Sequence, residues 1–373
     1  MRAERRPQGS SLRNCDRSQG LWSGHYHTGA FGVESALVTS PDGARRPTIR
    51  DVSRVAGVSH GTVSRYLNGG HWVSPEAREA VEAAITSTGY TANHAARSLA
   101  TGRSGSLAFL LTESQQLLFS DPTFALLLRG ATESLAERSM TLVLLIAGTE
   151  GERANVERYV RAGHVDGVLL VSSHESDALL ASLVEAGVPT VCSGLPLGDP
   201  DIPHVAIDEQ GAAREMTRYL RDAGRRRIAL ITGPHDTPGG RLRFEGFRAE
   251  MGERYDPALV EQGSYERGSG DAAMTRLLER APDLDAVFAA SDVMAVGAIE
   301  ALRRAGRRVP EDVAVAGFDD SGLAETMRPG LTTVRQPWSE ISATMVDMVL
   351  DIVAGRPRDS VVLPTTLVVR ESA

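Results

Sequence analysis

Lysine is absent from this sequence of 373 residues, and all 40 residues in the Lys and Arg count are arginine. Cysteine is scarce as well: Cys15 and Cys192 are too few for a disulfide framework, and no cysteine and histidine cluster predicts a zinc site. No apolar run approaches the ~18 residues of a membrane span. Arg2, Arg5 and Arg6 precede polar residues where a signal peptide needs an apolar segment. We expect a cytoplasmic protein without membrane contact, metal or cofactor.

The charges that are present divide unevenly along the chain. Residues 1–104 contain 13 Arg and 8 acidic residues, a balance of +5, whereas residues 105–373 contain 27 Arg and 40 acidic residues, a balance of −13. A basic first part on an acidic body favours a polyanionic partner for the first part. Because +5 is a modest excess, chance is the alternative.

Composition and periodicity divide the chain into four segments. Residues 1–46 are rich in Ser, Gly and Arg without periodicity, which predicts a disordered extension. Residues 47–92 predict three short helices, residues 93–104 a two-turn helix or linker, and residues 105–373 a body of alternating strands and helices. The predicted fold class is therefore α/β, with a small all-α head and a body built on parallel sheets.

The head has well-defined helix signals. Thr48 can cap a first helix with Asp51 as its reciprocal partner, Ser59 can cap a second, and Ser74 can cap a third. The first two are joined by the tight turn Ala56-Gly57-Val58, which makes them a helix-turn-helix candidate. The apolar face of the first helix is predicted to include Val55. A small helical bundle with a solvated polar face is the alternative.

In a helix-turn-helix, the second helix would present its outward face to the DNA major groove. The outward positions are His60, Gly61, Thr62, Ser64 and Arg65. Arg65 suits bidentate bonding to guanine, and His60 can donate or accept at a base edge. Ser59, Thr62 and Asn68 are of the types that contact phosphate groups.

Residues 93–104 are too short to form a stable helix alone. Asn93 could cap a helix ending before Gly102, and Leu99 is its one large apolar side chain. Such a helix would need a partner; an ordinary linker is the alternative.

In the body, strand-like runs alternate with amphipathic helices, which is typical of βαβ units. The predicted strands are 107–111, 141–146, 167–171, 189–192, 227–231, 286–289 and 313–317; the predicted helices include 123–138, 208–223, 241–251, 271–280, 292–305 and 338–354. A break near residue 205 predicts two similar lobes, with a ligand in the cleft between them at the carboxyl ends of the strands. Asp208 and Asp292 are interpreted as helix N-caps.

The segment from Thr48 to Asn68 resembles the DNA-binding signature of the LacI/GalR family of bacterial repressors. It has a Thr-Ile start, an Ala-Gly-Val-Ser turn, a Thr-Val-Ser-Arg helix and a closing Asn. Residues 93–102 resemble the family's hinge helix. The body resembles its periplasmic-binding-protein-like effector domain, in 225–228, 243–247, 291–298, 309–320 and 331–336. The likeness covers about residues 48–371.

The resemblance implies a homodimer whose two heads read a pseudo-palindromic double-stranded operator, with Leu99 of each hinge inserted into the minor groove. It implies a transcriptional repressor whose operator affinity is controlled by a small molecule, a sugar or sugar derivative, bound between the lobes. The candidate DNA contacts are Thr48, Ser59, His60, Gly61, Thr62, Ser64, Arg65, Asn68, Asn93 and Leu99.

Positions that match the family's effector contacts are Phe124, Arg243, Tyr265, Ser291, Asp319 and Trp338. The resemblance assigns sugar hydroxyls to Arg243 and Asp319, and pocket walls to the aromatic residues. Ser291 stands where Asn is usual. Two other positions depart from the family: Thr123 replaces half of an aromatic clamp, and Gly194 stands where many sugar-binding members have Asp.

Each effector position has a structural alternative. Arg243 and Asp319 could pair with one another, while Tyr265 and Trp338 could belong to the core.

Two other classes of protein share the α/β body. A solute-binding protein is disfavoured by the head and by the absence of a signal peptide. An enzyme is disfavoured because the sequence has no G-x-S-x-G, P-loop or H-E-x-x-H motif.

Overall fold

The computed structural model describes residues 47–67, 72–91, 102–175, 177–198, 201–356 and 358–373. The chain divides into two compact units, Met1–Thr91 and Ala92–Ala373. The extension predicted over 1–46 lies outside the described residues, as do Asn68, Asn93 and Leu99. No helix in the described part of the chain is long and apolar enough to cross a membrane.

The described residues of the first unit form the helices α1 (Ile49–Ala56), α2 (His60–Leu67) and α3 (Pro75–Thr88). The predicted caps are confirmed: the backbone N–H of Thr62 donates to Ser59 Oγ at 3.1 Å and that of Ala77 donates to Ser74 Oγ at 3.2 Å. Between α1 and α2, Gly57 has a φ of 66°, a left-handed conformation that glycine adopts without strain.

Four side chains form the small core of the head, namely Val52, Val63, Val81 and Ala84, each at most 1% exposed. The prediction that Val55 also faces inward is wrong, because its side chain is 55% exposed. So small a core leaves most side chains of these helices on the surface, where they can meet a partner.

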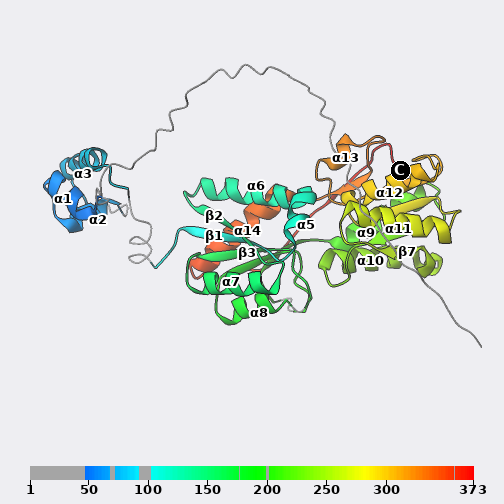
Figure 1. The fold of residues 1–373 in the computed structure, drawn as a ribbon, viewed down its shortest axis with the longest axis horizontal. Coiled ribbons are helices and arrows are strands. Elements are labelled where there is room, and N and C mark those ends of the chain that lie inside the picture. The colour runs from blue at the N-terminus through cyan, green and yellow to red at the C-terminus, as the bar shows by residue number, and fades with distance from the viewer. Residues whose placement is uncertain (1–46, 68–71, 92–101, 176, 199–200, 357) are drawn as a thin grey trace, which may run out of the picture. The chain divides into compact units, whose positions relative to one another are not determined.

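The first lobe of the second unit is a six-stranded parallel sheet in the order β11-β5-β4-β3-β1-β2. Figure 1 labels β1, β2 and β3 of this sheet. Its strands are β1 (Ser106–Leu111), β2 (Thr141–Ile146), β3 (Gly167–Val171), β4 (Thr190–Ser193), β5 (His204–Ile207) and β11 (Val361–Leu363). Helices α5 (Gln115–Ser120), α6 (Pro122–Ala136) and α14 (Trp338–Val353) pack on one side, and α7 (Glu150–Arg161) and α8 (Ala178–Glu185) on the other.

The second lobe is built on a four-stranded parallel sheet in the order β7-β6-β8-β9. Its strands are β6 (Ile228–Thr232), β7 (Val260–Gln262), β8 (Ala286–Ala289) and β9 (Ala314–Ala316). Helices α9 (Glu209–Asp222) and α10 (Pro238–Met251) cover one face, and α11 (Arg267–Arg280) and α12 (Asp292–Arg304) the other. The short elements are η1 (Gly252–Arg254), η2 (Pro257–Leu259), α13 (Leu323–Thr326) and the antiparallel pair β10 (Thr333–Arg335) and β12 (Thr366–Val368).

The described chain passes between the lobes at three places, which the single predicted break near residue 205 does not anticipate. The first passage, from β5 to α9, lies close to that break. The chain then returns from β10 to α14, and passes again from β11 to β12. Since α14 packs on α6 and β11 pairs with β5, the C-terminal part of the chain completes the first lobe. The prediction of two consecutive lobes is corrected accordingly.

Candidate functional site

A cleft of about 850 Å³, including the part open to solvent, lies between the two lobes. It is lined by residues at the carboxyl ends of strands from both sheets: Ser172 and Ser173 follow β3, Gly194 follows β4, and Thr237 lies beyond β6. This is where ligands bind parallel α/β sheets.

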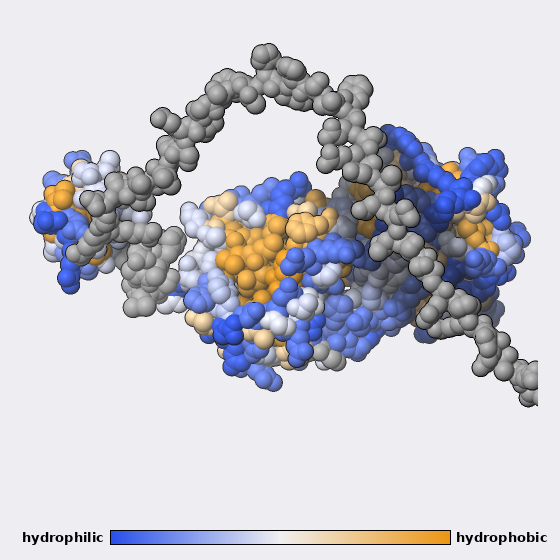
Figure 2. Space-filling view, viewed as in Figure 1, coloured by the Kyte–Doolittle hydropathy of each residue, from blue (hydrophilic) through white to orange (hydrophobic). Residues whose placement is uncertain are grey.

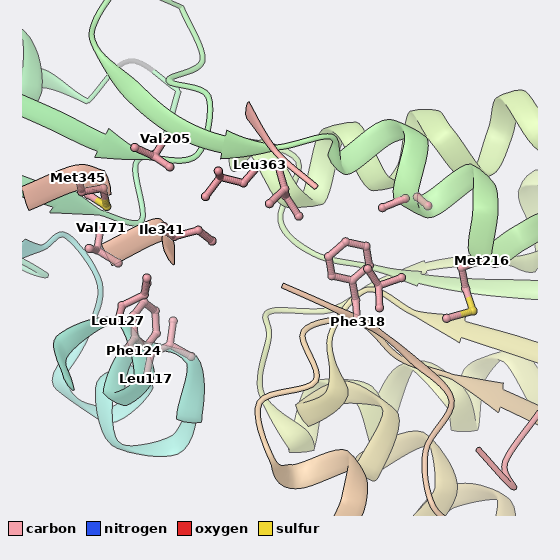
Figure 3. Packing of buried hydrophobic residues seen from close by; sticks show 14 of the residues in the cluster. Leu117, Phe124, Leu127, Val171, Val205, Met216, Phe318, Ile341, Met345 and Leu363 are labelled. Carbon is pink, nitrogen blue, oxygen red and sulfur yellow. The ribbon is translucent and has the colours of Figure 1, made fainter. Parts of the chain in front are cut away.

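One wall of the cleft is apolar (Figure 3). Phe124 and Leu127 of α6 lie opposite Ile341 of α14, and all three belong to one buried cluster. Trp338, at the start of α14, also lines the cleft, and its indole Nε1–H donates to the carbonyl oxygen of Asp319 at 3.0 Å. The wall therefore offers aromatic faces whose orientation is fixed by packing and by a hydrogen bond.

The guanidinium of Arg243, in α10, is the charged centre of the opposite side. Its Nε donates to Glu209 Oε2 at 2.6 Å and its Nη1 donates to the carbonyl of Ala290 at 2.6 Å. It also stacks on the Phe318 ring, 3.6 Å from the centroid. Burial opposes its charge, but the carboxylates of Glu209 and Asp319 outweigh burial and raise the pKa of Arg243. The side chain is thus a fixed cation with most of its hydrogen-bonding capacity already used.

Asp319 is held in a strained conformation beside this cation. Its φ is 115°, and its Oδ1 accepts from Gln336 Nε2 at 2.9 Å and lies 3.5 Å from Arg243 Nη1. Burial raises the pKa of Asp319, and the carboxylates of Asp292 and Asp121 raise it further against the attraction of Arg243. Strain of this kind is typical of functional positions.

Asp121 contributes a second carboxylate, from the first lobe. It caps α6, where its Oδ1 accepts from the backbone N–H of Thr123 at 2.9 Å and from the Thr123 hydroxyl at 2.8 Å. Burial raises the pKa of Asp121. Asp121 and Asp319 therefore place acceptors on two sides of the cleft, which suits a ligand rich in hydroxyl groups.

Tyr265 follows β7 with a φ of 61°, and its half-buried ring lies against the backbone of Gly233. A Cβ on Gly233 would be 2.2 Å from the Tyr265 hydroxyl oxygen, so only glycine leaves room for the ring. The hydroxyl lies 3.3 Å from Thr237 Oγ1. Burial raises the pKa of Tyr265 to about 12, so the phenol is neutral over the physiological range.

The prediction of an effector contact at Ser291 is not supported. Ser291 does not line the cleft, and its hydroxyl caps α12 by accepting from the backbone N–H of Met294 at 3.2 Å. The prediction that Asp292 is the cap is wrong for the same reason. Asp292 is instead buried within the first turn, where its Oδ1 accepts from the Thr333 hydroxyl at 2.6 Å.

On the head, the predicted reading face is only partly open. His60, Gly61 and Arg65 are exposed, whereas Thr62 and Ser64 are half-buried. The Thr62 hydroxyl lies 2.9 Å from that of Ser59, and Arg65 Nε donates to the carbonyl of Gly61 at 3.1 Å. Thr48 is half-buried, and its backbone N–H donates to the side chain of Asp51 at 2.9 Å, as predicted from their spacing.

Comparison with known proteins identifies both parts of the chain. Residues 48–93 match the model of bacterial regulatory proteins of the lacI family, and residues 217–373 match that of a periplasmic binding protein-like domain. The chain is 46% identical over 335 residues to the HTH-type transcriptional regulator CelR of Thermobifida fusca, covering 88% of this chain and 98% of that protein. It belongs to the LacI family.

Other LacI-family proteins confirm the identification. The ribose operon repressor of Escherichia coli K12 is 36% identical over 311 residues, 81% of this chain and 92% of the repressor. A solved transcriptional regulator CelR–cellobiose complex matches with a TM-score of 0.70 and 43% identity, over 88% of this chain and 100% of that one. A lac repressor dimer bound to operator and an anti-inducer matches with a TM-score of 0.78 and 26% identity, over 88% and 99%.

As a LacI-family member, the chain is a DNA-binding transcriptional regulator and not an enzyme. The structure brings together five of the predicted effector positions, and these line one cleft: Phe124, Arg243, Tyr265, Asp319 and Trp338. The described residues contain no group of three or more His, Cys, Asp or Glu side chains placed to hold a metal ion.

The sequence analysis missed several polar side chains of the cleft. Glu209 accepts a hydrogen bond from Arg243, and Gln336 donates one to Asp319. Glu113, which follows β1, also lines the cleft. Ser173 also lines the cleft; its side chain is buried, and its hydroxyl has no hydrogen-bond partner among the described residues. Their positions in the sequence could have indicated them, because Glu113 and Ser173 each come shortly after a predicted strand, where cleft residues are expected.

Proposed function

We propose that this protein is a transcriptional repressor that binds its operator as a homodimer. A sugar in the cleft releases it from the operator or changes its operator affinity. The observation that carries the proposal is the composition of the cleft. Acceptors on Asp121 and Asp319, the donors of Arg243 and the aromatic wall at Trp338 suit a neutral polyhydroxylated ring. We place this activity in the bacterial cytoplasm, where the operator is found.

Cellobiose is the first candidate for the sugar. The Thermobifida fusca regulator CelR is 46% identical over nearly its whole length, and a solved CelR structure is a complex with cellobiose. The ribose operon repressor is less similar, at 36%. Ribose is therefore the comparison ligand, and a β-linked disaccharide of glucose the expected one.

The dimer is supported by an exposed strand edge. Strand β2 ends the first-lobe sheet, and its sequence, Thr-Leu-Val-Leu-Leu-Ile, is apolar on both faces but only half covered. Leu144 is 41% exposed, and hydrophobic side chains gather on this lobe in Figure 2. An exposed apolar edge of this kind favours pairing with another chain, and a second copy would also supply the second head for a two-fold operator.

The experiment is a gel shift of the full chain on the DNA upstream of its own gene, with cellobiose, with ribose and without sugar. We expect a specific complex whose midpoint concentration changes with cellobiose and not with ribose. Calorimetric titration of cellobiose into the free protein reports binding independently of DNA. A protein that binds neither this DNA nor cellobiose would contradict the proposal.

A further inference from the structure

Two loops at the cleft carry a series of contacts from one lobe to the other. His174, after β3 of the first lobe, contacts Asp236, in the loop after β6 of the second, with 2.9 Å between Nδ1 and Oδ2. The backbone N–H of Glu175 donates to the carbonyl of Asp236 at 2.7 Å. The Glu175 carboxylate also pairs with Arg241 of α10. All these contacts must break if the lobes separate.

The other side of His174 faces the first lobe. Its Nε2 lies 2.8 Å from Oε1 of Glu113, a residue that lines the cleft. The same oxygen accepts from the Ser172 hydroxyl at 2.5 Å. A single imidazole thus connects a carboxylate of the cleft wall to the opposite lobe.

The geometry defines the charge of this imidazole. Both ring nitrogens contact carboxylate oxygens, which only accept, and only the protonated ring can donate from both. The hydrogen bond to Glu113 raises the pKa of His174 to about 9, against the opposing effect of burial and with a further contribution from Asp236. The other charged groups nearby are Glu175 and Arg241, which pair with each other.

We infer that His174 is a positioning residue for effector binding: as an imidazolium it orients Glu113 at the cleft wall and ties that wall to Asp236, so that closure of the lobes depends on its charge. The inference rests on the proposed function, in which the cleft holds the effector. His174 itself need not touch the ligand, since it acts through Glu113.

The sign of the pH dependence follows from proton linkage. When the lobes are closed, His174 faces two carboxylates and its pKa is about 9; when they open, Asp236 is lost as a partner and the pKa is lower. Closure is therefore favoured fully below the open-state pKa and loses that support as pH rises towards about 9. Tyr265, with a pKa of about 12, titrates above this range.

The first test needs no effector. Hydrogen exchange of the Glu175 amide, measured on the full chain at pH 7.5, reports the bond to the Asp236 carbonyl. His174→Gln and Asp236→Asn each remove one charge, one from each lobe, and both should accelerate exchange roughly two- to fivefold, as for a partly exposed ion pair. His164→Gln, at an exposed histidine that stacks on Tyr159, is the matched control. Unchanged exchange in both variants would overturn the inference.

The second test is calorimetric titration with cellobiose between pH 7 and 10. We expect the affinity of the unaltered protein to fall towards pH 9 and then to level off, whereas His174→Gln should bind roughly two- to fivefold more weakly at pH 7 with a flat profile. The melting temperature without sugar should fall somewhat at pH 7, because a pKa that is raised on folding means that the imidazolium stabilises the folded protein. The titrations are therefore run well below the melting temperature of each variant. Faster Glu175 exchange with unaltered cellobiose affinity would refute the positioning role. Faster exchange in a protein that never binds cellobiose would support the His174 contact and contradict the proposed sugar.

Discussion

Arg243 and Glu209 form a largely buried ion pair that joins α10 to α9 beside the cleft, with 2.6 Å between Nε and Oε2. The exposed fractions of the two side chains are 7% and 11%. The interpretation of Arg243 as a ligand contact and the alternative of an internal pair are therefore compatible, because the guanidinium lines the cleft and is also paired. This pairing changes what its removal should do.

We predict that Arg243→Ala abolishes effector binding and also destabilises the protein. Truncation would leave the Glu209 carboxylate buried without its partner, which costs about 3–5 kcal/mol in comparable sites. Thermal unfolding without sugar measures this loss directly. The matched control is Arg218→Ala, which removes an arginine that is 53% exposed. Its partner Glu250 keeps Arg214 and Arg221, so stability should change by under ~1 kcal/mol. Equal melting temperatures for the two variants would show that the buried pair contributes little.

Ser173→Ala is expected to separate effector binding from stability. The hydroxyl is buried and unpartnered among the described residues, so its removal should leave the free energy of unfolding unchanged or slightly raised. If a ligand hydroxyl is its partner, cellobiose affinity should fall about five- to tenfold, which corresponds to about 1 kcal/mol of a hydrogen bond. Calorimetry on the variant measures both effects.

Ser321→Ala is the control for this measurement. Ser321 is also buried, and its hydroxyl has no hydrogen-bond partner in the described part of the chain, but it does not line the cleft. It should bind cellobiose with unaltered affinity. Wild-type affinity in Ser173→Ala would mean that the Ser173 hydroxyl does not reach the ligand.

Local sequence signals predicted much of this fold. The caps at Ser59, Ser74 and Asp208 are present because a side-chain oxygen and a backbone N–H three residues later are neighbours in any helix start. Strand and helix bounds in the body agree to within a few residues for the same reason. Helices α10 and α11 begin earlier than predicted, at Pro238 and Arg267, so Arg243 lies in the second turn of α10 rather than the predicted first.

Long-range relationships could not be predicted from local patterns. The return of α14 and β11 to the first lobe involves residues more than a hundred positions from their partners, and alternation of strands and helices does not specify which sheet a late strand joins. The exchange of roles between Ser291 and Asp292 has a similar cause. Both can cap a helix, and only the burial of Asp292 beside Thr333 decides between them.

Leu144→Asp should convert the proposed homodimer into monomers. The substitution places a charge on the exposed apolar edge strand β2, where a partner strand or helix would have to bury it. Sedimentation at several concentrations measures the mass. Val362→Asp is the control at the opposite edge of the same sheet, in β11, where the side chain is 63% exposed. Dissociation caused by Val362→Asp and not by Leu144→Asp would place the interface at the other edge.

Arg65→Ala should reduce sequence discrimination by the head. Arg65 is the one cation predicted to face the major groove from α2; it is exposed, and its Nε bond to the Gly61 carbonyl leaves both Nη groups of the fork to reach a base. Loss of a bidentate contact to guanine costs about 1–3 kcal/mol on the specific site and little on random DNA.

Gel shifts on the operator and on random DNA of the same length measure the ratio of affinities. Arg276→Ala, which removes a surface arginine of α11, controls for the change in net charge. An equal loss of affinity on both DNAs would instead identify Arg65 as a contact to the DNA phosphate backbone. In that case the slope of log affinity against log salt concentration should also become shallower by about one unit, which corresponds to one phosphate contact.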